Sequence, residues 1–123
     1  NINSTLKATL LDKIIFSVTD EGYFVIINSS NGEIIRRTYL FDGIKKNLFD
    51  KIKKKKITIK PTGFIVGKNK IYISTNNGRI LVGDIKSGKV ISSIKIDNDL
   101  ISRPFVLNKN LFVIKANGIV KIN

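Results

Sequence analysis

The residues of this chain with most potential for chemistry are carboxylates in two short stretches, Asp20-Glu21 and Asp97-Asn98-Asp99. Alternating Asp and Asn side chains can supply the oxygen ligands of a calcium loop. Such a loop also needs Gly at its sixth position and Glu at its twelfth. Counted from Asp97, the sixth residue is not Gly and the twelfth is Asn108. Adjacent carboxylates without a fixed partner also give little support for paired acid–base catalysis. Because Asp and Asn dominate turns, we interpret both stretches as solvated turns.

Two short turns that contain Gly could bind phosphate through backbone N–H groups. They are Ser29-Ser30-Asn31-Gly32 and Lys86-Ser87-Gly88-Lys89. A phosphate cradle of this kind requires a helix after the turn, whereas β-forming residues follow both turns. We therefore interpret them as structural hairpin turns.

Several reactive residue types are missing from the chain. It contains no His, Cys, Met or Trp. Without Cys there is no disulfide, thiolate metal site or cysteine nucleophile, and without His the commonest general base is absent. Only carboxylates, Lys and Tyr remain for acid–base work. The sequence therefore predicts a protein that is not an enzyme and has no catalytic residue, cofactor or metal.

A repeated unit positions these residues, and its clearest copy runs from Asn69 to Ile91. The β-forming residues 71–74 precede Asn77-Gly78, which suits a tight turn with positive φ angles. A second apolar strand covers residues 80–85, and Gly88 supplies a left-handed residue in the next turn. This copy predicts an antiparallel meander.

The same pattern recurs upstream and downstream of that copy, at a period of about 40 residues that is typical of propeller blades. We expect Gly22, Gly32, Gly78, Gly88 and Gly118 to be the structural turn residues. The matching positions are Ile15, Phe16, Thr19, Gly22, Phe24, Gly32 and Ile34 upstream, and Leu111, Phe112, Asn117, Gly118 and Val120 downstream.

We predict an all-β protein, a β-propeller fragment of about three four-stranded antiparallel blades with the last blade incomplete. Nearly continuous apolar runs such as Tyr23 to Ile27 indicate sheets covered on both faces. This favours a propeller over a sandwich or a β-solenoid. The predicted units are a blade at 1–40, an insertion at 41–56, a blade at 57–99 and an incomplete blade at 100–123. The predicted strands are 5–10, 13–19, 23–28, 33–39, 62–66, 70–75, 79–85, 89–96, 104–107, 110–115 and 119–122.

Propellers close a ring of four to eight blades, so we expect this chain to be part of a larger ring. Its first residue, Asn1, indicates a fragment or a processed product, and we expect Asn123 to be the natural C-terminus. The missing strand would come from upstream of Asn1 or from a neighbouring copy. The chain alone should then be oligomeric or poorly soluble, because apolar blade surfaces would be exposed.

The insertion at 41–56 is the one segment that breaks the repeat. Its apolar residues recur every four positions, which predicts a short amphipathic helix with Asp42 as its cap. A disordered, solvated basic loop is the alternative. Because loops on rigid scaffolds often bind partners, we predict a partner-binding site here. Its residues would be Ile44, Lys45, Lys46, Leu48, Phe49, Ile52, Lys53 and Lys54.

The net charge of +13 would suit an acidic protein, an anionic lipid surface or nucleic acid. Lys far outnumbers Arg, although Arg is favoured for nucleic-acid recognition, so we expect no nucleic acid. The abundance of Ile, Lys and Asn also fits compositional drift in an AT-rich genome. Selection for an acidic or lipid partner stays open as the alternative.

The blade signature, carried by Tyr72, Asn77-Gly78, Asp84 and Ser87-Gly88, resembles the PQQ-type propeller repeat family. Dehydrogenases of that family lock their blades with Trp four residues after the second Gly, and they hold quinone and calcium. This chain has Arg36 and Ser92 at the Trp positions. The resemblance therefore implies the non-catalytic, BamB-like branch of the family.

That resemblance implies a scaffold for protein–protein interaction that assists outer-membrane β-barrel assembly. It further implies a periplasmic location, with or without a lipid anchor to the outer membrane, and a partner in the assembly machinery. The alternative is a fragment of a PQQ-dependent quinoprotein dehydrogenase whose active-site blades lie outside this chain.

Overall fold

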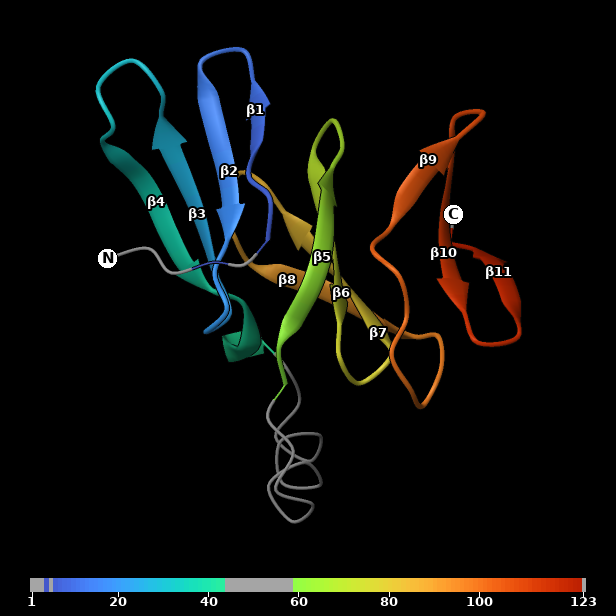
Figure 1. Cartoon of the computed structure of the whole chain (residues 1–123). Helices are drawn as coiled ribbons and strands as arrows, with labels where there is room; N and C mark the ends of the chain where they lie inside the picture. Colours follow the sequence, from blue (N-terminus) through green and yellow to red (C-terminus); the bar gives the residue numbers. More distant parts are fainter. Residues whose placement is uncertain (1–3, 5, 44–58, 123) are drawn as a thin grey trace.

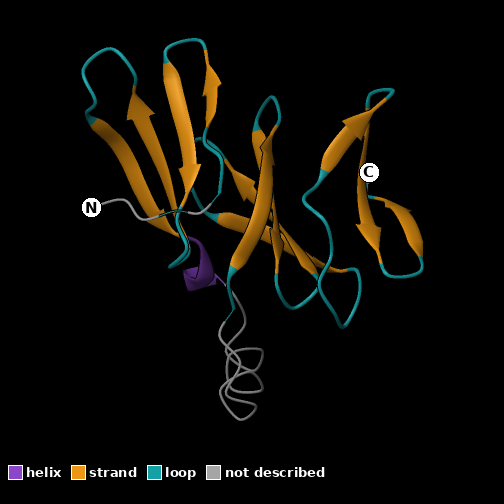
Figure 2. Ribbon diagram, in the orientation of Figure 1, coloured by secondary structure: helices purple, strands orange, loops and turns teal. Residues whose placement is uncertain are grey.

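The computed structural model describes residue 4 and residues 6–43 and 59–122 (Figure 1). These residues form two four-stranded sheets and one three-stranded sheet, in which neighbouring strands are antiparallel. The sheets follow one another across the molecule in sequence order (Figure 1), and strands joined by loops make up most of the described residues (Figure 2). The prediction of an all-β, three-bladed architecture with a shorter last blade is confirmed.

The first blade is formed by four strands in sequence order, followed by a short 3-10 turn. The strands are β1 (Thr9–Leu11), β2 (Ile14–Val18), β3 (Tyr23–Asn28) and β4 (Ile34–Tyr39), and the 3-10 turn η1 covers Leu40–Gly43.

The second blade repeats this order, and the third contains three strands within the described residues. The strands of the second blade are β5 (Pro61–Val66), β6 (Lys70–Thr75), β7 (Arg79–Asp84) and β8 (Val90–Lys95). Those of the third are β9 (Phe105–Leu107), β10 (Asn110–Lys115) and β11 (Gly118–Lys121).

The first strand is shorter than predicted. We expected it at residues 5–10, but β1 begins at Thr9. The Leu6 N–H donates to the Ser4 hydroxyl at 3.1 Å, and that hydroxyl donates in turn to the Val18 carbonyl. A Ser side chain thus makes the contact with the end of β2 that a backbone ladder would otherwise make.

The outer turns of the first two blades have the same hydrogen-bond pattern. The Gly32 N–H donates to the Asn28 carbonyl at 2.8 Å, and the Gly88 N–H donates to the Asp84 carbonyl at 2.7 Å. Both glycines have positive φ angles, 75° and 74°. The upstream match seen in the sequence is therefore a match of backbone geometry.

The turn between the second and third strands differs in the last blade. Gly22 and Gly78 lie inside this turn, whereas Gly118 already pairs with Lys115 as the first residue of β11. The turn is consequently shorter, and Val120 lies opposite Val113. The predicted match of Val120 to Ile80 is therefore wrong in register, since Ile80 lies opposite Ser74.

The core consists of two apolar clusters, one at each contact between blades. Phe16 and Phe24 of the first blade pack with Ile73 and Leu81 of the second. On the other side of β7, Ile80 and Val82 pack with Ile101 and Val113. Strand β7 of the middle sheet is thus buried on both faces.

The outer faces of the first and third blades carry exposed apolar side chains. Leu10 and Ile34 of the first blade are 62% and 52% exposed, and Ile119 of the third is 66% exposed. Within the described residues β11 pairs with β10 alone. Those residues also include no helix with the length and hydropathy needed to cross a membrane.

Candidate functional site

All eight residues predicted to bind a partner lie outside the described part of the chain. Ile44, Lys45, Lys46, Leu48, Phe49, Ile52, Lys53 and Lys54 belong to the segment 44–58. The structure does describe the residues on either side of this segment, up to Gly43 and from Ile59 onward. These flanking residues anchor the segment to the blades.

The upstream anchor is formed by Leu40 and Phe41, which are 1% and 3% exposed. The Leu40 N–H donates to the Gly22 carbonyl at 2.8 Å. The Phe41 ring meets the Tyr39 ring edge-on, with 5.5 Å between their centroids. Phe41 therefore belongs to the core, although it lies after β4, the last strand of the first blade.

The downstream anchor is formed by Ile59 and Lys60. Ile59 is 8% exposed and joins the cluster between the first two blades. The Lys60 N–H donates to the Asn76 side-chain oxygen at 3.0 Å, and the Asn76 N–H donates to the Lys60 carbonyl at 2.9 Å. Sequence reasoning missed Asn76 as an anchor because its partner lies outside its own hairpin.

The two anchors rest on equivalent turns of neighbouring blades. One is the β2–β3 turn with Gly22, and the other is the β6–β7 turn with Asn76. Both turns lie at the end of the sheets where η1 also lies (Figure 1). This end therefore fixes both flanks of the insertion on a rigid base, which suits a segment that presents side chains to a partner.

Aromatic and cationic side chains lie beside the upstream anchor. The Arg37 guanidinium carbon lies 4.3 Å from the centroid of the Tyr23 ring. The Tyr23 and Tyr39 rings are 5.2 Å apart between centroids. A cation over an aromatic face is attracted by the ring quadrupole. These contacts connect exposed Arg37 to the buried start of the insertion.

The stretch Asp97-Asn98-Asp99 has the geometry of a turn. The Asn98 N–H donates to the Asp97 side chain at 2.7 Å. The Gly78 carbonyl accepts from the N–H groups of Ile96 and Asp97, which holds the stretch against the β6–β7 turn. Within the described residues no group of three or more His, Cys, Asp or Glu side chains is placed to hold a metal ion.

The two turns considered for phosphate binding use their own side chains to satisfy N–H groups. The Ser87 N–H donates to the Asp84 carboxylate at 3.1 Å, and the Ser30 N–H donates to the Asn28 side chain at 2.9 Å. Hydrogen bonds from the Ser87 side chain and then its backbone lower the pKa of Asp84 below its usual 3.8. An ionised Asp84 next to these N–H groups disfavours a second anion there.

The family's Trp positions lie on the outermost strands of the first two blades. Arg36 is on β4 opposite Ile26, and Ser92 is on β8 opposite Val82. A β-carbon added to Gly88 would come within 3.2 Å of the Arg36 Cδ, so Arg36 approaches the turn of the next blade. At this contact Arg36 and Thr38 of the first blade lie against the Gly88 turn of the second.

No family model matches the chain, and no curated protein matches its sequence. Many solved structures resemble its fold, among them the following three. BamB from Moraxella catarrhalis has a TM-score of 0.66 and 19% identity, over 98% of this chain and 31% of that one. The Cps50 (Swd1) β-propeller domain from Myceliophteria thermophila has a TM-score of 0.61 and 16% identity, over 85% of this chain and 35% of that one.

The third is quinohemoprotein alcohol dehydrogenase ADHIIG from Pseudomonas putida HK5. Its TM-score is 0.63 and its identity 15%, over 92% of this chain and 17% of that one. This chain thus spans about a third of BamB's length and less of the dehydrogenase's. At such identities the likeness concerns the fold alone, and the fold is that of β-propeller blades.

Proposed function

We propose that this chain is a non-catalytic propeller scaffold that holds a protein partner on the insertion at 41–56. The observation that carries the proposal is the double anchoring of the insertion, at Phe41 on one blade and at Lys60 on the next. A segment fixed at both ends loses less conformational freedom on binding than a free tail does, which favours affinity.

The partner and location in this proposal come from the resemblance to BamB-like propellers. The partner is a periplasmic domain of the machinery that assembles outer-membrane β-barrels, and the chain works in the periplasm at the outer membrane. The fold similarity to BamB from Moraxella catarrhalis supports this choice. The basic residues of the insertion, Lys45, Lys46, Lys53 and Lys54, would face acidic groups of the partner.

The experiment that tests the proposal replaces residues 44–57 with a short Gly-Ser linker and keeps both anchors. We expect the affinity for the purified periplasmic domains of the main assembly protein to fall by about tenfold or more, or about 1.4 kcal/mol. Binding is measured by calorimetry. If the parent chain and the linker variant bind with equal affinity, the insertion is not part of the interface.

A matched pair of variants separates a protein partner from an anionic lipid surface. One variant changes the apolar residues Ile44, Leu48, Phe49 and Ile52 to Ser, and the other changes Lys45, Lys46, Lys53 and Lys54 to Ser. A protein partner that holds the apolar face should be lost in the first variant. If the parent chain binds phosphatidylglycerol vesicles and only the Lys-to-Ser variant loses that binding, the partner is a lipid surface instead.

The alternative function, part of a quinoprotein dehydrogenase, has support from the fold similarity to the Pseudomonas putida enzyme. Arg36 and Ser92 at the Trp positions favour the scaffold. Adding PQQ with Ca²⁺ should leave the melting temperature unchanged, because only a ligand of the native state shifts stability. A rise of several degrees would favour the dehydrogenase.

A further inference from the structure

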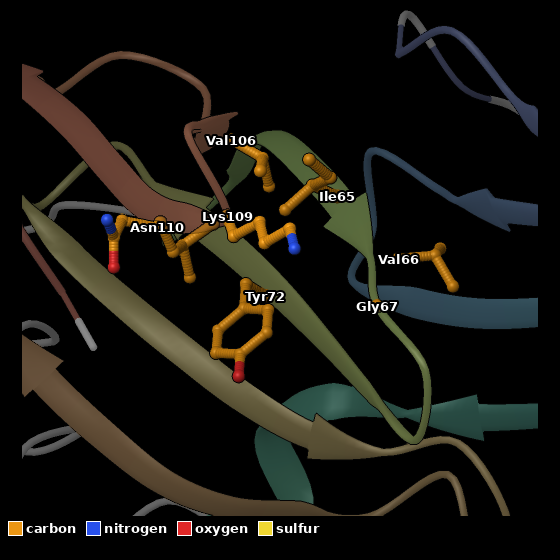
Figure 3. A pocket seen from close by; sticks show the side chains of 8 residues that line it. Ile65, Val66, Gly67, Tyr72, Val106, Lys109 and Asn110 are labelled. Carbon is orange, nitrogen blue, oxygen red and sulfur yellow. The ribbon is translucent and has the colours of Figure 1, made fainter.

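A hollow of about 160 Å³ lies between the second and third blades, at the end of the sheets opposite η1 and the β6–β7 turn (Figure 1). Its walls include Ile65 on β5, Tyr72 on β6, and Val106 and Leu111 on the third blade, and Lys109 lies at its rim (Figure 3). The hollow holds about five water molecules at ~30 Å³ each, roughly the space of one large apolar side chain.

At the corresponding contact between the first and second blades, the matching side chains pack against the core. Phe16, which matches Tyr72 in the repeat, is 8% exposed and belongs to the core there. Val66, which matches Val106, packs against the same core, whereas Val106 is 57% exposed. The hollow is thus a departure from the repeat at which apolar surface stays accessible.

Lys109 is held at the rim of the hollow by an uncommon backbone conformation. Asn108 and Lys109 have φ angles of 51° and 64°, which are those of a type I′ turn between β9 and β10. The second position of such a turn favours Gly, so Lys is a costly choice there. Its side chain lies between those of Tyr72 and Ile65 (Figure 3).

Within the described residues the Lys109 ammonium forms no ion pair or hydrogen bond. An apolar hollow with one uncompensated cation at its rim complements a ligand that carries an apolar group beside an anion. We propose that this hollow binds a peptide whose large apolar side chain stands next to a carboxylate. The volume admits one side chain, whereas most of a long acyl chain would remain in water.

This inference rests on the proposed scaffold role and adds a second contact for a peptide partner, distant from the insertion. The probe is the tripeptide acetyl-Gly-Ser-Phe with a free carboxylate, and its control is the same peptide as a C-terminal amide. Binding is followed through backbone amide shifts of the whole chain by NMR. We expect shifts at Gly67, Tyr72 and Lys109 and about fivefold tighter binding of the carboxylate.

Two variants of the β9–β10 turn make the test specific. Lys109→Gly suits the φ of 64° and removes the cation, so it should fold and bind the carboxylate about fivefold more weakly, at the level of the amide. Asn108→Gly is the matched control, because it changes the same turn at φ 51° and leaves Lys109 in place. Its affinity should equal that of the parent chain.

The proposal is overturned if the amide binds as tightly as the carboxylate, or if Lys109→Gly keeps the parent affinity. It is also overturned if neither peptide shifts these amides at about 10 mM, where even a millimolar ligand is bound. Tighter binding of octanoate than of the tripeptide would make the hollow a fatty-acid site. None of these results bears on the linker experiment at the insertion, so the two proposals fail separately.

Discussion

The ring of Phe41 packs directly on Gly22, so that a β-carbon at Gly22 would lie only 2.8 Å from the Phe41 Cδ2. Gly22 has a φ of 98°, which other residues rarely adopt. The turn between β2 and β3 is therefore shaped to receive the first residue of the insertion. This contact fixes where the variable segment leaves the blade.

Gly22→Ala should destabilise the chain by about 2 to 4 kcal/mol, because backbone strain adds to overpacking against Phe41. Gly32→Ala is the matched control, with a φ of 75° and no atom within 4 Å of the added β-carbon. It should cost about 1 kcal/mol from strain alone. Urea unfolding measures both, and equal losses would show that the Phe41 contact is not restrictive.

Phe41→Ala should cost about 3 to 5 kcal/mol, since the ring is 3% exposed in the core. Replacing residues 44–57 by a short linker should change the free energy of unfolding by about 1 kcal/mol or less, because loop length affects closure entropy only weakly. Thermal and urea unfolding compare the two proteins. A linker variant that fails to fold would place those residues in the core.

Acid should weaken the β7–β8 turn at Asp84. The Ser87 hydrogen bonds lower the pKa of Asp84 in the folded state, so their stabilisation is present above pH 3.8 and is lost as the pH falls through the lower folded value. Asp84→Asn keeps an acceptor for the Ser87 N–H, as Asn28 does in the first blade. The melting temperature of this variant should depend less on pH below 4 than that of the parent chain. An unchanged dependence would contradict the role of Asp84.

The Lys109→Gly variant should be as stable as the parent or about 1 kcal/mol more stable, because it places Asn-Gly in a type I′ turn. Urea unfolding of the variant measures this gain. A loss of stability would mean that the Lys109 side chain contributes packing that outweighs its backbone cost.

Local sequence signals predicted most of the fold. Asn77-Gly78 marked the place of the turn between β6 and β7, although Gly78 has the predicted positive φ angle and Asn77 does not. The apolar run at Tyr23 to Ile27 marked a strand buried on both faces. These signals act within a few residues of the chain, so the amino-acid types suffice. The structure adds a further likeness between the outer turns, because the Asn28 and Asp84 side chains each accept from a Ser N–H.

Long-range contacts explain what the sequence did not predict. Phe41 reads as part of an amphipathic insertion, and only the packing on Gly22 shows that it belongs to the core. The exchange of hydrogen bonds between Lys60 and Asn76 likewise joins two separate connections. The hollow at Tyr72 arises because the third blade leaves open a contact at which the matching side chains of the first two blades pack against the core, which no local pattern encodes.

Site-specific photo-crosslinking in cells tests the scaffold proposal most directly. Benzoylphenylalanine at Phe49, inside the insertion, should give a crosslinked adduct with one protein partner of the assembly machinery. The control position is Ile91 on β8, which is 56% exposed and lies outside the insertion. The account predicts an adduct from position 49 and none from position 91. A partner captured at 91 and not at 49 would contradict it.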